Sequence, residues 1–449
     1  MKKKQKRKNH NRLYIMCGLI TIAILGVVLF ASLFKWDQGK SNGYRVDYEP
    51  NPTNYIGNST GTNWKGYEAR SLNIQKIDEP SANKHGTCGI LNDGLDPYAA
   101  SNLIIPDTVQ IDDKLYDIVK IVTGAFSKNT YLHGSLTLSN NITEIGNNAF
   151  YQCSEISGSL VIPNSVTTIG KSAFWGCAGF NGSLVISNSV TEINGLTFGE
   201  CKGFSGGLVI PNSVTLIGEV AFSGCSGFSG GLTLSNNVTE IGDYAFTNCS
   251  GFSGSLTLSN SITAIGEHAF SGCKGFSGGL TLSNNLTAIG EDAFSGCSGF
   301  TGELVIPNSV TKIGDYAFHG CSKFTGGLVI PNSVTTIGIG AFWKCSGLNG
   351  SLVIPNSVTE INELTFCACS GFSGGLVIPD NITLIGPMAF SGCSGFTGNL
   401  IIPDNVTRIE AGAFNNCSGF TGNLIISDGV TSIESDAFEG CTGLTITYQ

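Results

Sequence analysis

A block of 24 residues repeats without insertion or deletion over most of the chain, and this constrains the fold more than any other feature. The first copy, from Leu136 to Ser159, reads LTLSNNITEIGNNAFYQCSEISGS. A fixed period of ~20–50 residues indicates a solenoid, propeller or array of stacked units. Thirteen such copies start at Leu136, Leu160, Leu184, Leu208, Leu232, Leu256, Leu280, Leu304, Leu328, Leu352, Leu376, Leu400 and Leu424.

Several positions of the repeat never vary. Counted from the opening Leu, position 8 is always Thr, position 10 Ile, position 15 Phe and position 18 Cys, while position 5 is always Asn or Asp. The opening Leu-x-Leu/Ile predicts a short strand whose two ends point inward. A second short strand is expected at Val/Ile/Leu-Thr-x-Ile. Ala-Phe-x-x-Cys has the spacing of one face of a helical turn, and the following Gly-Phe returns an aromatic ring to the interior.

The middle residue of the first strand is expected to point outward. It is β-branched in every copy, and it forms the candidate partner-binding face: Thr137, Val161, Val185, Val209, Thr233, Thr257, Thr281, Val305, Val329, Val353, Val377, Ile401 and Ile425. β-propensity alone also explains this choice of residues. The alternative is a long, weakly charged surface for contact with a protein or glycan.

One copy cannot fold alone. It has about six large apolar side chains, each contributing ~1.5–3 kcal/mol when buried, whereas ordering 24 backbone units costs ~1–2 kcal/mol each. Stacked copies add strand hydrogen bonds and cover one another's aromatic rings. The sequence therefore predicts a solenoid of equal coils around one continuous interior.

The N-terminal region differs in composition. Residues 1–12 carry seven basic side chains and no acidic one, and Leu13–Phe34 is a 22-residue stretch without charge. That length spans a hydrocarbon core of ~30 Å as a helix, and a signal peptide would have a shorter apolar segment. We therefore expect an uncleaved transmembrane helix, with the basic tail in the cytoplasm and the remainder outside the cell; a cleaved signal is the alternative.

The remaining chain divides into three parts. Residues 35–84 are rich in Gly, Asn, Ser and Tyr and are predicted to be a flexible stalk, with one possible strand within Trp64–Ile77. Residues 85–135 are predicted to be an atypical first coil that caps the stack, and Val109 to Ile118 suggests a small hairpin inserted in it. The thirteen repeats occupy residues 136–449, and Thr445–Tyr448 could close the last coil with a strand.

The motif Leu160-x-Ile-Pro-x-x-Val-Thr-x-Ile-Gly-x-x-Ala-Phe-x-x-Cys177 and its relatives resemble the BspA-type leucine-rich repeat family. The resemblance covers Leu103 to Tyr448. It implies an α/β-type, right-handed leucine-rich repeat solenoid, β-rich with short helical turns. It also implies a surface protein, often an adhesin or antigen that binds host matrix or other cells. Copies in the family are commonly a residue or two shorter, and the family has no shared set of binding residues.

The sequence favours neither metal nor cofactor binding. Thirteen of the 16 Cys residues occupy one repeat position, where a file of buried thiols is expected and disulfides between neighbours are the alternative. Cys367 lies off this file and is a candidate reactive thiol. His268 and His319 occupy different variable positions and have no recurring Ser, Cys or acid in a triad arrangement. Asp380 and Asp404 stand where other copies have the turn residue Asn.

The charge of the repeats excludes a nucleic-acid partner. From Leu136 onward there are seven basic and 21 acidic side chains, a net charge of −14, so the basic surface that nucleic acid requires is missing. We expect a membrane-anchored cell-surface protein that mediates adhesion or protein interaction. The alternatives are a structural scaffold of the cell envelope without a host ligand and, less favoured, an enzyme.

Overall fold

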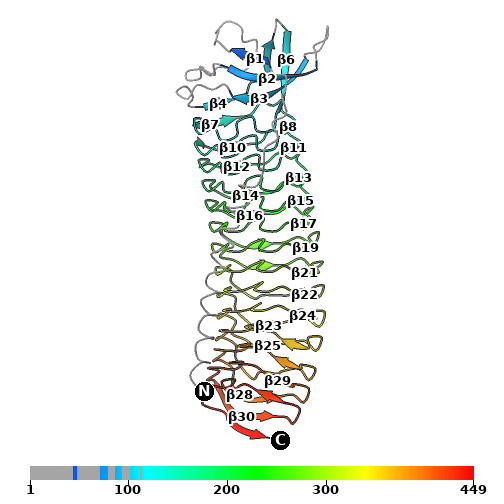
Figure 1. Cartoon of the computed structure of the whole chain (residues 1–449), viewed down its shortest axis with the longest axis vertical. Coiled ribbons are helices and arrows are strands. Elements are labelled where there is room, and N and C mark those ends of the chain that lie inside the picture. The colour runs from blue at the N-terminus through cyan, green and yellow to red at the C-terminus, as the bar shows by residue number, and fades with distance from the viewer. Residues whose placement is uncertain (1–43, 48–70, 79–85, 94–101, 112–113, 449) are drawn as a thin grey trace, which may run out of the picture. The chain divides into compact units, whose positions relative to one another are not determined.

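The computed structural model describes residues 44–47, 71–78, 86–93, 102–111 and 114–448, and all of these belong to one compact unit, Gly43–Gln449 (Figure 1). The basic tail and Leu13–Phe34, the predicted transmembrane helix, lie outside the described residues. No helix capable of crossing a membrane is found in the described part of the chain.

Each coil contributes a first strand at its opening Leu, and these strands lie on one side of the stack (Figure 1). The copies starting at Leu304 and Leu376 are exceptions and have no strand at the opening Leu. The first strands are β4 (Asn102–Ile104), β7 (Gly134–Thr137), β10 (Leu160–Val161), β12 (Leu184–Val185), β14 (Leu208–Val209), β16 (Leu232–Thr233), β18 (Leu256–Thr257), β20 (Leu280–Thr281), β23 (Leu328–Val329), β25 (Leu352–Val353), β28 (Gly398–Ile402), β30 (Phe420–Ile426) and β32 (Thr445–Tyr448).

A second strand ends at the invariant Ile of each coil, on the opposite side of the stack. These strands are β6 (Lys114–Ile121), β8 (Glu144–Ile145), β11 (Thr168–Ile169), β13 (Glu192–Ile193), β15 (Leu216–Ile217), β17 (Glu240–Ile241), β19 (Ala264–Ile265), β21 (Ala288–Ile289), β22 (Lys312–Ile313), β24 (Thr336–Ile337), β26 (Glu360–Ile361), β27 (Leu384–Ile385), β29 (Arg408–Ile409) and β31 (Ser432–Ile433). Both predicted strands of the repeat are therefore confirmed.

Where the strands of neighbouring coils pair, they do so in parallel and in register. Leu160 lies opposite Leu184 and Val161 opposite Val185, and the second strands repeat this pattern, with Ile217 opposite Ile241. Because every copy has 24 residues, equivalent positions meet along the whole stack. The strands are only two residues long in most coils, so each coil is held mainly by its contacts with the coils above and below.

Two columns of aromatic rings fill the interior. Position 15 supplies fourteen Phe rings, from Phe126 to Phe438, and successive ring centroids lie 5.0–5.7 Å apart with nearly parallel planes. Position 21 supplies a second column of Phe rings that contacts the first edge-on, as at Phe174 and Phe180 with centroids 6.5 Å apart. Apart from Phe438, which is partly exposed in the last coil, the rings of both columns are fully buried.

The Ala-Phe-x-x-Cys segment forms hydrogen-bonded turns, and the described residues contain no helix, so the expectation of a helical turn is corrected. Positions 13 and 17 have left-handed backbone in nearly every copy, for example φ of 59° at Val220. The N–H of Phe150 donates to the carbonyl of Ala173 in the next coil at 2.7 Å instead of to its own coil. An α-helix requires right-handed backbone at every residue and hydrogen bonds within the helix. In this segment some residues are left-handed, and some N–H groups bond to the next coil instead.

The thirteen file cysteines are free and buried, as predicted. Each thiol donates a hydrogen bond to the carbonyl of the Phe in the preceding coil, as Cys177 does to Phe150 at 3.0 Å. Burial raises the pKa of the Cys225 thiol, the fourth in this file, well above its ordinary value. A protonated thiol that donates to a backbone carbonyl gives that buried acceptor a partner.

The N-terminal coil is capped by a sheet with antiparallel strands. Strands β1 (Tyr44–Asp47), β2 (Ser71–Asp78) and β3 (Gly86–Asp93) pair antiparallel in that order, and β3 pairs in parallel with β6. The predicted hairpin is confirmed, because β5 (Thr108–Ile111) pairs antiparallel with β6 and Val109 lies opposite Tyr116. The short β9 (Ile156–Ser157) pairs with β7. At the other end β32 pairs with β30, as the sequence suggested.

Substitution in the first aromatic column is expected to be costly. Phe246 has a stacked ring at 5.2 Å on both sides, so Phe246→Ala leaves a cavity that the coils cannot close. We expect a loss of ~3–5 kcal/mol in the free energy of unfolding, measured by urea denaturation. The matched variant Phe252→Leu should lose less than half as much, because Leu348 fills the equivalent position of another copy. Equal losses in the two variants would contradict this account of the core.

Candidate functional site: the exposed strand file

The thirteen predicted site residues form one continuous row, which we call the strand file. Twelve of them are exposed and Ile425 is half-buried. The valines are the most informative members, because 45–73% of their surface is accessible although valine is usually buried. Their neighbours on either side along the strand, such as Leu160 and Ile162, are buried.

The row follows from the register of the first strands. Successive residues of a strand point to opposite faces, so burial of the two flanking residues forces the middle one outward. The N–H of Ile162 donates to the carbonyl of Val185 at 2.9 Å, and the same bond recurs in other coils, for example from Leu258 to Thr281. Within each pair of first strands, such as β10 with β12 or β14 with β16, the β-branched side chains therefore stand side by side at the strand spacing of ~4.8 Å.

The strand file is longer than the sequence analysis proposed. Ile104 of β4 lies opposite Thr137. Ile104 is exposed. Leu103-Ile104-Ile105 had the repeat's opening pattern, so the signal for Ile104 was present in the sequence.

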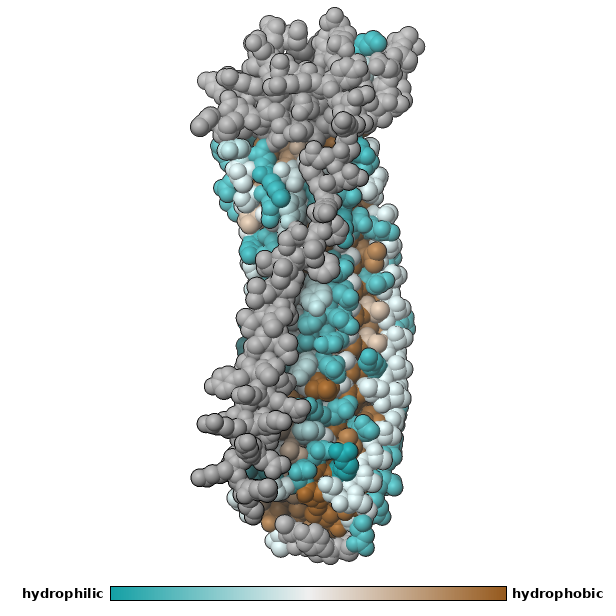
Figure 2. Space-filling model, viewed as in Figure 1, coloured by the Kyte–Doolittle hydropathy of each residue, from teal (hydrophilic) through white to brown (hydrophobic). Residues whose placement is uncertain are grey.

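The borders of the strand file carry little charge. The residue before each opening Leu is Ser, Gly or Asn except for Glu303, and the turn after the strand is Pro or Ser followed by Asn or Asp. Asp380 lies in a turn, as predicted, and its backbone carbonyl accepts a hydrogen bond from Asn405 Nδ2 at 2.6 Å. On the face shown in Figure 2, hydrophobic residues are interspersed with hydrophilic and neutral ones along the stack.

A shallow groove lies on the second sheet instead. It has a volume of about 350 Å³, and residues of β15, β17 and β19 with their following turns line it. Glu219, Glu240 and Asp243 give this groove its negative charge. It is separate from the strand file, and the sequence analysis did not predict it.

His268 lies beside acidic residues that the sequence analysis did not connect with it. Its ring stacks on Tyr244 with centroids 4.6 Å apart, and its Nδ1 lies 3.8 Å from Asp292 Oδ2. Burial and the neighbouring carboxylates raise the pKa of Glu291, and burial is the main cause of the raised pKa of Asp292.

His319 is packed against different groups. Its Nδ1 lies 3.3 Å from Ser295 Oγ, its ring stacks on Trp343 at 4.6 Å, and its buried Nε2 has no hydrogen-bond partner. The Ser295 side chain is itself buried. A hydrolytic serine needs an accessible hydroxyl and an oriented base, and this pair provides neither.

Cys367 is half-buried between the coils of Trp343 and Ser391. Burial raises the pKa of its thiol, although Ser391, Lys344 and Trp343 act in the opposite direction. Since the thiolate is the nucleophile, this environment disfavours the reactive role that the sequence left open.

Stacked coils with parallel strands and an apolar interior define the chain as a leucine-rich repeat solenoid, and the comparisons with known proteins agree. The BspA type leucine rich repeat region, in six copies, matches residues 101–229, 205–325, 239–373 and 323–445, which together exceed half of the chain. The chain belongs to the BspA-type leucine-rich repeat family. No curated protein is significantly similar to it.

Two solved structures are similar to the chain. A leucine-rich repeat protein from Bacteroides ovatus ATCC 8483 is 24% identical, with a TM-score of 0.66 over 84% of this chain and 98% of that one. A leucine rich cell surface protein from Faecalibacterium prausnitzii A2-165 is 25% identical, with a TM-score of 0.48 over 86% of this chain and 96% of that one. The first of these likenesses supports the fold.

The environment of His319 predicts a pH dependence of stability. Burial, with a smaller contribution from Lys344, lowers the pKa of His319 from 6.5 to about 4. Between these pH values the unfolded chain binds more protons here than the folded one, so stability falls as the pH falls from 6.5 to 4. His319→Ser places a residue that other copies have at this position, such as Ser223.

The melting temperature of the wild type should therefore decrease more than that of His319→Ser when the pH is lowered through this window. Thermal melts followed by circular dichroism at several pH values measure the difference in melting temperature between the two proteins. The pH dependence caused by the carboxylates common to both proteins cancels in this difference. Parallel decreases in the two proteins would show that His319 is not protonated on unfolding.

Proposed function

We propose that this chain is a single-pass, membrane-anchored cell-surface protein whose strand file binds a protein or glycan ligand outside the cell. The observation that carries the proposal is the row of thirteen β-branched residues, twelve of them exposed, with an almost uncharged border. Its valines are accessible over 45–73% of their surface, although nothing in the packing of the coil requires an apolar residue there.

The geometry of the strand file suits weak contacts repeated many times. No deep pocket is needed, because equivalent side chains present the same contact in each coil. The overall affinity of linked weak contacts can exceed the affinity of a single contact by a factor of ~10²–10⁴ when the ligand also repeats. A fibrous or multivalent ligand, such as a matrix protein or a glycan chain, meets this condition better than a small molecule does.

The N-terminal sequence supports the membrane anchor. Leu13–Phe34 has 22 residues without charge and follows seven basic side chains. The positive-inside tendency then assigns the tail to the cytoplasm and the repeats to the exterior. Family membership agrees with a non-enzymatic binding scaffold, and nothing in the described residues shows a catalytic arrangement.

Charge placed in the strand file is expected to abolish binding. The full chain, displayed on cells, would carry Val329→Glu and Val353→Glu, which lie on the paired strands β23 and β25. We expect loss of adhesion to extracellular-matrix proteins and to host cells, measured as retained cells after washing, because carboxylates buried at the contact would be desolvated without a partner.

The matched control places the same charge on the other side of the stack. Thr168→Glu and Thr336→Glu change exposed second-strand positions where Glu144, Glu192 and Glu360 occur naturally, so they should leave adhesion unchanged. If both pairs of substitutions reduce adhesion equally, the added negative charge causes the loss wherever it lies, and the strand file is not the binding surface. If the wild type adheres to nothing outside its own envelope, the alternative of a structural scaffold is favoured.

The orientation can be tested separately. Protease added to intact cells should degrade the repeats, provided that the same protease cuts the chain after the cells are lysed. Degradation is measured by immunoblotting with antibodies against the repeats. Repeats that survive on intact cells but are cut in the lysate would contradict an extracellular location.

A further inference from the structure

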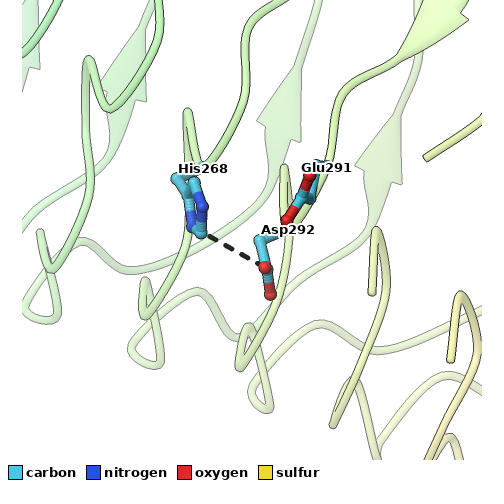
Figure 3. Close-up of side chains that lie close together, drawn as sticks. All are labelled: His268, Glu291 and Asp292. Atoms are coloured by element: carbon cyan, nitrogen blue, oxygen red, sulfur yellow. Dashed lines mark ion pairs between the residues drawn. The ribbon is translucent and has the colours of Figure 1, made fainter. Parts of the chain in front are cut away.

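We propose that His268, Glu291 and Asp292 form a binding site for a divalent first-row transition-metal cation such as Zn²⁺. The three residues lie in two neighbouring coils, and one ligand atom from each can be chosen so that all three lie within 4.8 Å of one another. Figure 3 shows the imidazole of one coil facing the carboxylates of the next.

The hydrogen-bond pattern of the coils creates this juxtaposition. Position 13 donates its N–H to the carbonyl of position 12 in the following coil, and His268 does so to Glu291 at 2.7 Å. Left-handed backbone at His268 and Asp292, with φ of 54° and 50°, turns both side chains along the same edge. The site is therefore built by the repeat even though its residue types occur together only here among the described coils.

The spacing is close to that of a metal site. Zinc binds imidazole nitrogen and carboxylate oxygen at ~2.0–2.2 Å, which separates ligand atoms in a tetrahedron by ~3.4 Å. The His268 Nδ1 to Asp292 Oδ2 distance is 3.8 Å, too long for a hydrogen bond. The three ligand atoms lie within 4.8 Å of one another, and the Glu291 and Asp292 side chains would rotate toward the ion when it binds.

The cluster has an excess of negative charge. Among the residues that the structure describes, the salt bridges of lysine and arginine join Lys120 to Glu144, Lys202 to Glu200 and Arg408 to Glu410, and none reaches Glu291 or Asp292. Position 12 is also acidic in the adjoining coils, at Glu267 and Asp315. A bound divalent cation would offset this repulsion between neighbouring coils.

Contacts around the ligands restrict their motion. The Tyr244 ring stacks on the imidazole with an angle of 12° between the planes. The backbone carbonyl of His268 accepts a hydrogen bond from Thr247 Oγ1 at 2.6 Å, and the Ser295 hydroxyl contacts Asp292. Supporting contacts of this kind commonly orient metal ligands in proteins.

The ligand set selects the class of cation. Imidazole nitrogen suits Zn²⁺ and similar ions, whereas Ca²⁺ and Mg²⁺ prefer oxygen ligands only. Three protein ligands leave at least one coordination position of a four-coordinate ion for water or an oxygen atom of another molecule. The inference does not depend on the proposed function of the strand file.

The test measures Zn²⁺ and Ca²⁺ binding to the detergent-solubilised full chain by equilibrium dialysis and metal analysis. We expect one Zn²⁺ per chain in excess of the triple variant His268→Asn, Glu291→Gln, Asp292→Asn. Each single substitution should weaken Zn²⁺ binding at least ~10-fold. Asn is chosen because it accepts the left-handed backbone at His268 and Asp292. Hydrogen exchange should slow on Zn²⁺ addition at residues 267–268 and 290–292.

The matched control is His133→Asn, which removes an exposed imidazole far along the chain and should leave Zn²⁺ binding unchanged. Circular dichroism verifies that every variant is folded. Equal Zn²⁺ binding by the wild type and the triple variant would overturn the proposal. So would Ca²⁺ binding as strong as Zn²⁺ binding, or Zn²⁺ binding that is unaffected by His268→Asn, since either result indicates a general acidic surface.

Discussion

The structure depends on the match between two spacings. Parallel strands lie ~4.8 Å apart, and the Phe rings of the first column follow one another at 5.0–5.7 Å. Offset stacking of aromatic rings is favourable at such distances, so backbone pairing and ring packing both require coils of one thickness. A coil with a different length would disturb both at once, which explains why no copy has gained or lost a residue.

This arrangement separates the residues that hold the stack from those that distinguish one coil from another. The invariant Phe and Cys are buried, and the cysteine thiols bond to backbone carbonyls of the preceding coil. The variable side chains lie on the rims, where they form the strand file, the groove on the second sheet and the cluster around His268. The candidate functional residues of the described coils therefore lie on these rims.

Much of the fold could be predicted from the sequence, because the interior is encoded by residue type. The period located both strands, and alternation assigned Val161 to the outside and Leu160 to the inside. The turn around Val220 could not be predicted, since valine disfavours left-handed backbone and only the inter-coil hydrogen bonds impose it. The proximity of His268 to Asp292 was hidden for the same reason: it depends on which carbonyl each position-13 N–H reaches.

The left-handed residue at position 13 has a consequence for how such a protein can change. Twelve of the thirteen copies adopt this conformation, and the residues there range from glycine to leucine, valine, tyrosine and histidine. Non-glycine residues bear a conformational cost of ~1–3 kcal/mol in such conformations. The packing of the interior in each coil offsets this cost. Position 13 on one rim of the solenoid can therefore hold side chains of almost any type without loss of the fold. New surface properties could arise there by substitution in one coil at a time.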